Sequence, residues 1–190
     1  NSHESLHTKI CSTACLDCGW SANYLGNFEC LAKGYNHFSI NKDFKLSQQD
    51  IKSLKVGIVF SRFNEPVVKE ILESCINQLI SKGISENHIL KKEVPGALEI
   101  PALINAFATT KKYNVLIGVG AVIRGETYHF EVVSDQSANG LMQVQLKHNI
   151  PVINAIITTN SGEEAFARTK IKGKEAADGA IEMALMMGEV

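Results

Sequence analysis

From Lys55 onward the sequence alternates between short apolar runs and amphipathic segments, and this alternation constrains the fold more than any other feature. Short runs rich in Val and Ile are typical of strands that are buried on both faces. The predicted strands are 55–61, 88–94, 114–123 and 151–159. Four strands that are each followed by a helix predict an α/β fold, in which a four-stranded parallel sheet is covered by helices on both faces.

The amphipathic segments have recognisable helix ends. Gly83 ends the first segment, and Pro101 fits the second only if it lies in or near the first turn. The motif SGEE at Ser161 to Glu164 has the pattern of a helix cap. The predicted helices are 66–83, 95–113, 129–148, a short helix that begins at SGEE, and a separate final helix over 173–187.

Residues 1–54 show no sustained periodicity, and we expect a poorly ordered N-terminal extension ahead of a domain over 55–190. The motif SQQD at 47–50 resembles a capping box and predicts one short helical turn before the domain. The first arginine is Arg62, which argues against an Arg-rich organelle-targeting peptide, although the chain starts at Asn1 without methionine. We expect a cytoplasmic protein, and the extension leaves a plastid location open.

The chain has five cysteines, an odd number without a recognisable secretory signal, which predicts reduced thiols. The spacing of Cys11, Cys15 and Cys18 is one that can hold an iron–sulfur cluster, and Cys30 would complete four zinc ligands. The alternative, a tail that happens to carry cysteines, is favoured because radical chemistry on a cluster would require a large barrel domain after it. No metal and no cofactor are therefore predicted. Cys75 falls on the apolar face of a helix and is expected in the core.

Charge and hydropathy exclude two classes of partner. The net charge is −1 and no basic stripe is present, so nucleic acid is not expected as a partner. No apolar run approaches the roughly 20 residues of a membrane helix, so no membrane partner is expected. Small molecules remain as the expected ligands.

Parallel sheets bind ligands beyond the carboxyl ends of their strands, so the third strand-to-helix turn, RGETYH, is a candidate site. Gly125 would let the backbone approach an anion, Thr127 offers a hydroxyl, and the amides of Glu126 and Thr127 are expected to open a helix that favours a phosphate. The alternative is an ordinary helix start capped by Thr127. His129 suits proton transfer near neutral pH, although a histidine at a helix start also occurs as a surface or capping residue.

Three further side chains have two interpretations each. Glu99 would either accept hydrogen bonds from sugar-like hydroxyls or cap its helix. Phe63 would either pack against the next helix or form a platform for a flat heteroaromatic ring. Arg168 would either bind a phosphate or lie along a surface helix. The residues alone predict an α/β domain that binds a phosphate and a ring at the strand ends.

Four blocks of the sequence resemble the lumazine synthase family, the penultimate enzyme of riboflavin biosynthesis. They are FN at 63–64, VPGALEIP at 94–101, GAVIRGETYHFE at 120–131, and PVINAIITT at 151–159 together with Arg168. The blocks have the family's order, and the resemblance extends over about 55–187. It implies a flavodoxin-like three-layer α/β/α sandwich that assembles into homopentamers, which in some members form icosahedral shells.

The resemblance also implies a reaction without metal or cofactor, in which 5-amino-6-(D-ribitylamino)uracil and L-3,4-dihydroxy-2-butanone 4-phosphate give 6,7-dimethyl-8-ribityllumazine. The substrate's own amine forms the Schiff base, so the enzyme mainly positions groups, binds an anion and transfers protons. The implied roles are ring stacking for Phe63, ribityl binding for Ala97, Leu98 and Glu99, ring-edge contacts for Ala121, Val122 and Ile123, phosphate binding for Glu126 and Thr127, and proton transfer for His129. Asn154 and Arg168 are implied to reach the pyrimidine and the phosphate from a neighbouring subunit.

Two departures from the family pattern leave alternatives open. Asn154 stands where many relatives carry phenylalanine, although asparagine also occurs there. The link between Arg168 and Lys172 is shorter than usual, and it contributes to whether pentamers join into shells. The alternative to an enzyme is a non-catalytic homologue, which would bind flavin or lumazine or form a shell.

Overall fold

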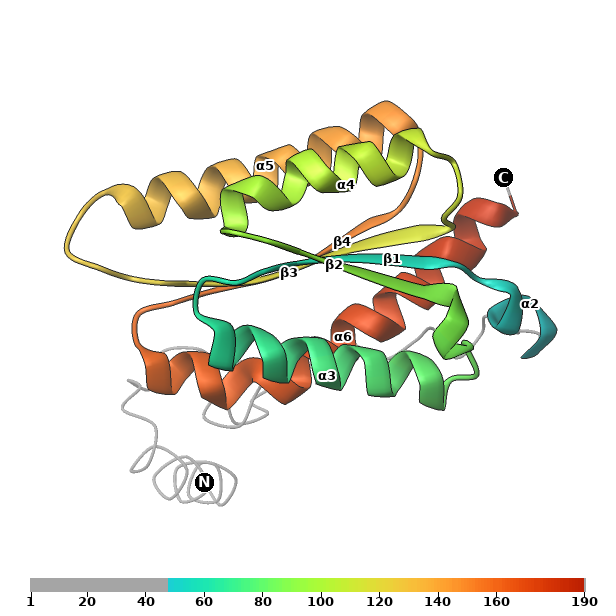
Figure 1. The fold of residues 1–190 in the computed structure, drawn as a ribbon, viewed down its shortest axis with the longest axis horizontal. Coiled ribbons are helices and arrows are strands. Elements are labelled where there is room, and N and C mark those ends of the chain that lie inside the picture. The colour runs from blue at the N-terminus through green and yellow to red at the C-terminus, as the bar shows by residue number, and fades with distance from the viewer. Residues whose placement is uncertain (1–47, 190) are drawn as a thin grey trace, which may run out of the picture. The chain divides into compact units, whose positions relative to one another are not determined.

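A four-stranded, all-parallel sheet forms the middle layer of the protein, with the strand order β2-β1-β3-β4 (Figure 1). The structure, a computed structural model, describes residues 48–189. The elements are α2 (Gln48–Ser53), β1 (Val56–Ser61), α3 (Glu65–Ser81), η1 (Glu86–His88), β2 (Ile89–Val94), η2 (Ala97–Glu99), α4 (Ile100–Thr109), β3 (Val115–Ile123), α5 (His129–His148), β4 (Val152–Thr159) and α6 (Gly162–Gly188). The predicted flavodoxin-like three-layer α/β/α sandwich is confirmed.

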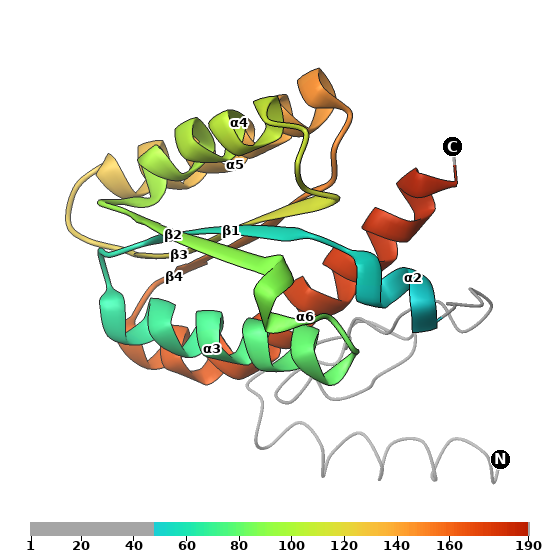
Figure 2. The same cartoon turned by 45° about the vertical axis from the view of Figure 1, so that its right-hand side comes forward.

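Two helices cover each face of the sheet. Helices α4 and α5 lie on one face, and α3 and α6 lie on the other (Figures 1 and 2). Side chains of the strands feed two separate apolar clusters, because successive residues of a strand point to opposite faces. Ile58 and Ile117 are fully buried toward α3 and α6, whereas Val59 and Leu116 are fully buried toward α4 and α5. Burial on both faces explains why β1 and β3 read as continuous apolar runs, whereas the edge strand β2 is mostly exposed and carries Lys91, Lys92 and Glu93.

Most of the predicted elements are confirmed with shifts at their ends, the largest at α4, which spans Ile100–Thr109 where 95–113 was expected. Helix α5 occupies the predicted range 129–148. Pro101 lies in the first turn of α4, where its missing N–H removes no helical hydrogen bond. The short helix predicted at SQQD is present as α2.

The end of the chain differs from the prediction, because one helix, α6, runs without a break from Gly162 to Gly188 where two helices were expected. Gly173 lies in the middle of this helix and is buried. A Cβ atom on Gly173 would lie 2.5 Å from the Ile71 carbonyl oxygen and 2.6 Å from the Ser74 Cβ atom, both on α3. The glycine therefore marks a close approach between two helices, and it does not end a helix.

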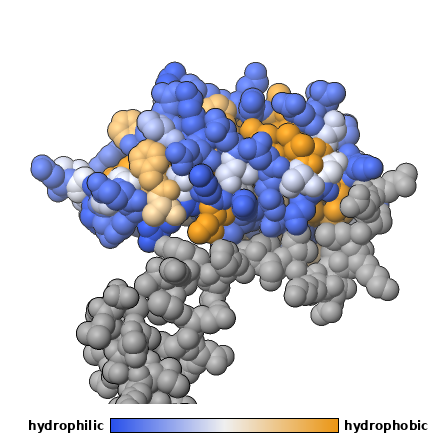
Figure 3. Space-filling view, turned by 90° about the horizontal axis from the view of Figure 1, so that it is seen from below, coloured by the Kyte–Doolittle hydropathy of each residue, from blue (hydrophilic) through white to orange (hydrophobic). Residues whose placement is uncertain are grey.

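The outer face of the α3 and α6 layer is mostly hydrophilic, with a few apolar patches (Figure 3). Exposed apolar side chains on these two helices include Ile80, Phe166 and Met186. Among the described helices, none combines the length and the apolar character that crossing a membrane requires.

Cys75 lies on α3 and is fully buried, as predicted. Burial, with a smaller contribution from the nearby Asp178 carboxylate, raises the pKa of its thiol to about 12. Since the thiolate is the reactive form, we expect Cys75 to resist iodoacetamide at pH 8 in the native protein and to react readily in denaturant. Mass spectrometry of the peptide that contains Cys75 measures both rates, and equal labelling with and without denaturant would contradict this prediction.

The cysteines Cys11, Cys15, Cys18 and Cys30 lie outside the described residues, as do residues 1–47 of the predicted extension, whereas Ile51 and Leu54 at its end are buried in the core. The cytoplasmic or plastid location also stays a prediction.

Candidate active site

The carboxyl ends of the four strands meet at one edge of the sheet, and β3 extends further there than its neighbour β1. The ladder between β1 and β3 ends at the Phe60–Val119 pair, whereas β3 continues to Ile123. Its last residues run beside the turn between β1 and α3. This overhang leaves a stretch of β3 backbone that the β1 ladder does not use, which suits contacts with a planar ligand.

The turn between β1 and α3 is joined to both neighbouring strands. The backbone N–H of Phe63 donates to the Pro95 carbonyl oxygen at 3.1 Å. Asn64 has a left-handed backbone (φ 59°), which asparagine tolerates better than most residues, and its Nδ2 donates to the Ala121 carbonyl oxygen at 2.9 Å. The Phe63 side chain is 71% exposed, so it does not pack as a staple against α3.

The turn between β2 and α4 carries Ala97, Leu98 and Glu99 in a short 3₁₀ helix. Ala97 is buried, whereas Leu98 and Glu99 are exposed. A Cβ atom on Gly96 would lie 2.9 Å from Glu99 Oε2, so the absent side chain makes room for this carboxylate. Glu99 makes no side-chain cap hydrogen bond to α4, which argues against the capping interpretation.

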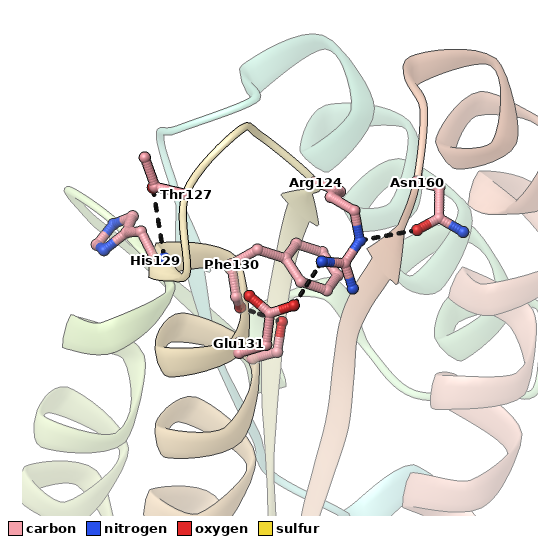
Figure 4. Close-up of polar contacts among 7 residues, drawn as sticks. Arg124, Thr127, His129, Phe130, Glu131 and Asn160 are labelled. Carbon is pink, nitrogen blue, oxygen red and sulfur yellow. Dashed lines mark hydrogen bonds and ion pairs between the residues drawn. The ribbon is translucent and has the colours of Figure 1, made fainter.

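The turn between β3 and α5 differs from the prediction at one point. Helix α5 begins at His129, so the amides of Glu126 and Thr127 do not open it. The residue at the N-cap is Tyr128, which makes no side-chain cap, so Thr127 is not the helix cap either. Thr127 Oγ1 instead accepts a long hydrogen bond, 3.4 Å, from the backbone N–H of His129 (Figure 4). The two extra residues outside the helix lengthen the turn around the expected anion site.

These three turns enclose a pocket of about 390 Å³. Its size is in the range of small-molecule sites. The predicted site residues that line it are Phe63, Ala97, Leu98, Glu99, Ala121, Val122, Ile123, Thr127 and His129. The structure therefore brings together nine predicted residues from three separate parts of the chain.

Three predicted site residues do not line this pocket. Glu126 is exposed on the turn beside it. Asn154 is exposed on the edge strand β4, where its Oδ1 accepts from the Ile156 backbone N–H at 2.9 Å. Arg168 lies on α6, where its NH1 donates to the Glu164 carbonyl oxygen at 2.7 Å. Within one chain, Asn154 and Arg168 are not part of the pocket.

The pocket also contains residues to which the sequence assigned no role. These are Asn64, Phe130 and Val133, whereas Gly125, which also lines the pocket, was expected beside an anion. Asparagine adopts the left-handed backbone conformation more readily than most residues. An asparagine in a turn after a buried strand was therefore the available signal for Asn64. Phe130 and Val133 look like ordinary core positions of a helix, so their spacing alone could not separate a pocket wall from a core.

The main electrostatic feature beside the pocket is the carboxylate of Glu131. A hydrogen bond from Arg124, followed by a backbone hydrogen bond, lowers the pKa of this carboxyl group. Glu131 is therefore ionised at neutral pH and pairs with Arg124. Among residues 48–189, no three His, Cys, Asp or Glu side chains are grouped closely enough to hold a metal ion.

The comparisons with known proteins agree on one family. The family model described as 6,7-dimethyl-8-ribityllumazine synthase matches residues 53–188. A curated protein of that name from Methylobacillus flagellatus is 50% identical over 132 residues, which cover 70% of this chain and 89% of the relative. The protein of the same name from Nitrosospira multiformis is 49% identical over 133 residues, which cover 70% of this chain and 83% of the relative. The matched range contains all three turns that form the pocket.

Proposed function

The chain belongs to the 6,7-dimethyl-8-ribityllumazine synthase family, and from this membership we propose that the pocket at the strand ends is its active site. The protein is a transferase of riboflavin biosynthesis. It condenses 5-amino-6-(D-ribitylamino)uracil with L-3,4-dihydroxy-2-butanone 4-phosphate to give 6,7-dimethyl-8-ribityllumazine, phosphate and water. The observation that best supports the proposal is that predicted site residues from all three turns line the same pocket.

The pyrimidine would bind between the exposed Phe63 ring and the overhanging end of β3. An exposed aromatic ring at a pocket mouth offers a stacking face for a planar heterocycle. The backbone groups of Ala121, Val122 and Ile123 would contact the edge of the ring. The ribityl chain would extend toward Ala97, Leu98 and Glu99, where the Glu99 carboxylate accepts hydrogen bonds from hydroxyl groups.

The phosphate of the second substrate would bind at the turn between β3 and α5. The Thr127 hydroxyl and the backbone amides at Glu126 and Thr127 are the proposed donors, and the N-terminus of α5 favours an anion nearby. His129 begins that helix and lines the same pocket. We assign to it the proton transfers that accompany Schiff-base formation and phosphate loss.

Arg168 and Asn154 would complete the site of a neighbouring subunit in a homopentamer. Both lie outside the pocket of their own chain, which is the arrangement expected of residues that serve another copy. Whether pentamers join further into a shell depends on surfaces of the assembled pentamer.

The direct test is to mix the two substrates with the purified protein and to follow the fluorescence of the lumazine product. We expect product formation that is faster than the uncatalysed condensation and that saturates with both substrates. A protein that binds flavin or lumazine tightly and yet gives no acceleration would contradict the proposal and support the non-catalytic alternative.

A subunit-mixing experiment tests the shared site. His129→Ala and Arg168→Ala subunits are each impaired alone, but a mixed pentamer contains some sites with His129 from one chain and Arg168 from another. In an equal mixture about one quarter of the sites would be intact, so refolding the two variants together should restore part of the activity. Activity that equals the mean of the separate variants would show that each site uses one chain.

Arg168→Ala is expected to raise the KM for the phosphorylated substrate with a smaller change in the KM for the pyrimidine. A hydrogen bond to a charged group contributes about 1.5–3 kcal/mol, which corresponds to about 10- to 150-fold in affinity. Lys174→Ala is the matched control, because it removes an exposed cation from the same helix. An unchanged KM in Arg168→Ala would contradict the assignment.

A further inference from the structure

The guanidinium of Arg124 makes contacts in three directions beside the pocket. Its Nε donates to Asn160 Oδ1 at 3.0 Å, and its NH1 pairs with the Glu131 carboxylate. Its central carbon lies 4.1 Å from the centre of the Phe130 ring. Figure 4 shows Arg124 on the side of Phe130 away from His129 and Thr127. Arg124 is not among the residues that line the pocket.

These contacts hold the first turn of α5 from outside the pocket. Phe130 and Glu131 directly follow His129, and Phe130 lines the pocket while its ring also meets the guanidinium. The helix start itself has no side-chain cap. The backbone N–H of His129 makes a long hydrogen bond, 3.4 Å, to Thr127 Oγ1, and the next two residues add the contacts to Arg124, one from each.

The same guanidinium is connected to the start of α6. The turn before α6 is bonded to Arg124 through Asn160, whose own backbone N–H donates to Glu164 Oε2 at 3.0 Å. The Glu164 N–H donates to Ser161 Oγ at 3.2 Å, and its carbonyl oxygen accepts from Arg168 NH1 at 2.7 Å. A series of hydrogen-bonded residues thus runs from Arg124, in the turn before His129, through Asn160 and Glu164 to Arg168.

We infer that Arg124 is a positioning residue that fixes two catalytic elements at once: the start of α5 with His129, and the start of α6 with Arg168. The inference rests on the proposed function for the roles of His129 and Arg168. His129 would act in the site of its own chain, and Arg168 would act in the site of a neighbouring chain. Arg124 therefore connects the two elements by which one chain serves two different active sites.

An arginine suits this position better than a lysine. Its planar group presents separate N–H donors to Glu131 and Asn160 and a flat face to Phe130, whereas an ammonium group offers one compact charge. Arg124→Lys can keep the pair with Glu131 but not the complete set of contacts. Asn160→Ala leaves the arginine in place and removes only the connection to α6.

The test measures kcat and the KM of each substrate for Arg124→Met, Arg124→Lys and Asn160→Ala. Because a displacement of about 1 Å can cost about 100-fold in rate, we expect Arg124→Met to lose on the order of 10- to 100-fold in kcat/KM. Arg124→Lys should recover part of this loss. Asn160→Ala should raise the KM of the phosphorylated substrate while the KM of the pyrimidine substrate stays near the wild-type value, a split that general destabilisation would not produce.

The matched control is the exposed ion pair between Lys69 and Glu65 on α3, at 2.6 Å and outside the pocket lining. Lys69→Met should leave both kinetic constants unchanged. If Arg124→Met loses no more activity than Lys69→Met, the inference is wrong. If Arg124→Met does not fold, Asn160→Ala decides, and equal KM changes for both substrates in that variant overturn the inference.

His129→Ala is assayed in the same series to separate the two proposals. A strongly impaired His129→Ala enzyme beside an unimpaired Arg124→Met enzyme overturns the positioning role alone. A fully active His129→Ala enzyme overturns the proposed role of His129, and the positioning inference with it.

Discussion

His129→Ala is expected to lower kcat by about 10²- to 10⁴-fold, the range that a positioned acid–base group contributes. His129 begins α5 and lines the pocket. Schiff-base formation, loss of phosphate and ring closure each move protons, and a histidine can both donate and accept them near neutral pH. The KM values should change much less, because the ring and phosphate contacts are assigned to other residues. Stopped-flow or steady-state fluorescence of the lumazine product measures both constants.

Two companion variants sharpen this test. His129→Asn keeps a polar side chain but cannot exchange protons near neutral pH, so it should be impaired as strongly as His129→Ala. His88→Ala removes a histidine from η1, at the amino-terminal end of β2, and should leave kcat unchanged. A His129→Asn enzyme with nearly wild-type kcat would indicate that the side chain orients substrate without transferring protons.

Gly173→Ala is expected to destabilise the fold by about 3 kcal/mol or more, at the upper end of the cost of overpacking a core. The added methyl group would lie 2.5 Å from the Ile71 carbonyl oxygen and 2.8 Å from the Cys75 backbone nitrogen. These are backbone atoms, so no side-chain rotation can relieve the overlap, and α3 and α6 must separate. The higher helix propensity of alanine offsets only about 1 kcal/mol of this cost.

Thermal unfolding measures the effect of this substitution. A loss of about 3 kcal/mol in a domain of this size lowers Tm by roughly 6–12 °C. Gly188→Ala is the matched control, since it makes the same change at the end of the same helix, where an added Cβ atom meets nothing within 4 Å. Gly188→Ala should leave Tm unchanged or slightly higher. A Gly173→Ala protein as stable as Gly188→Ala would show that the helices can part without cost.

The elements that the sequence predicted well are those whose signal is local. The strands β1 and β3 are buried on both faces, so their apolar runs were continuous, and α3 has a regular apolar stripe between a proline in its first turn and Gly83 after its end. The error at α6 arose from Gly173, because a glycine in a helical pattern reads equally as a stop or as a contact. Only the position of α3 distinguishes the two, and α3 is about a hundred residues earlier in the sequence.

The pocket followed from the topology together with the resemblance, because parallel strands bring their carboxyl ends to one edge. The start of α5 at His129 was predicted, but its cap was not: Thr127 is a good cap by residue type, yet Tyr128 occupies the N-cap position. The contacts of Arg124 could not be predicted at all from spacing. They become apparent once β3 and β4 are aligned, because Ile123 pairs with Thr159, and Arg124 and Asn160 follow that pair.

The overhang of β3 beyond β1 has a consequence for how the enzyme can tolerate mutation. The proposed ring-edge contacts are made by peptide groups, which are the same for every amino acid except proline. Most substitutions at Ile123, which lies beyond the β1 ladder, would therefore alter the shape of the wall and leave its hydrogen-bonding pattern intact. The feature that mutation can more easily disrupt is the distance by which β3 extends beyond β1. A residue inserted into or deleted from the end of β1 would therefore threaten substrate recognition more than most replacements of the residues that are proposed to touch the substrate.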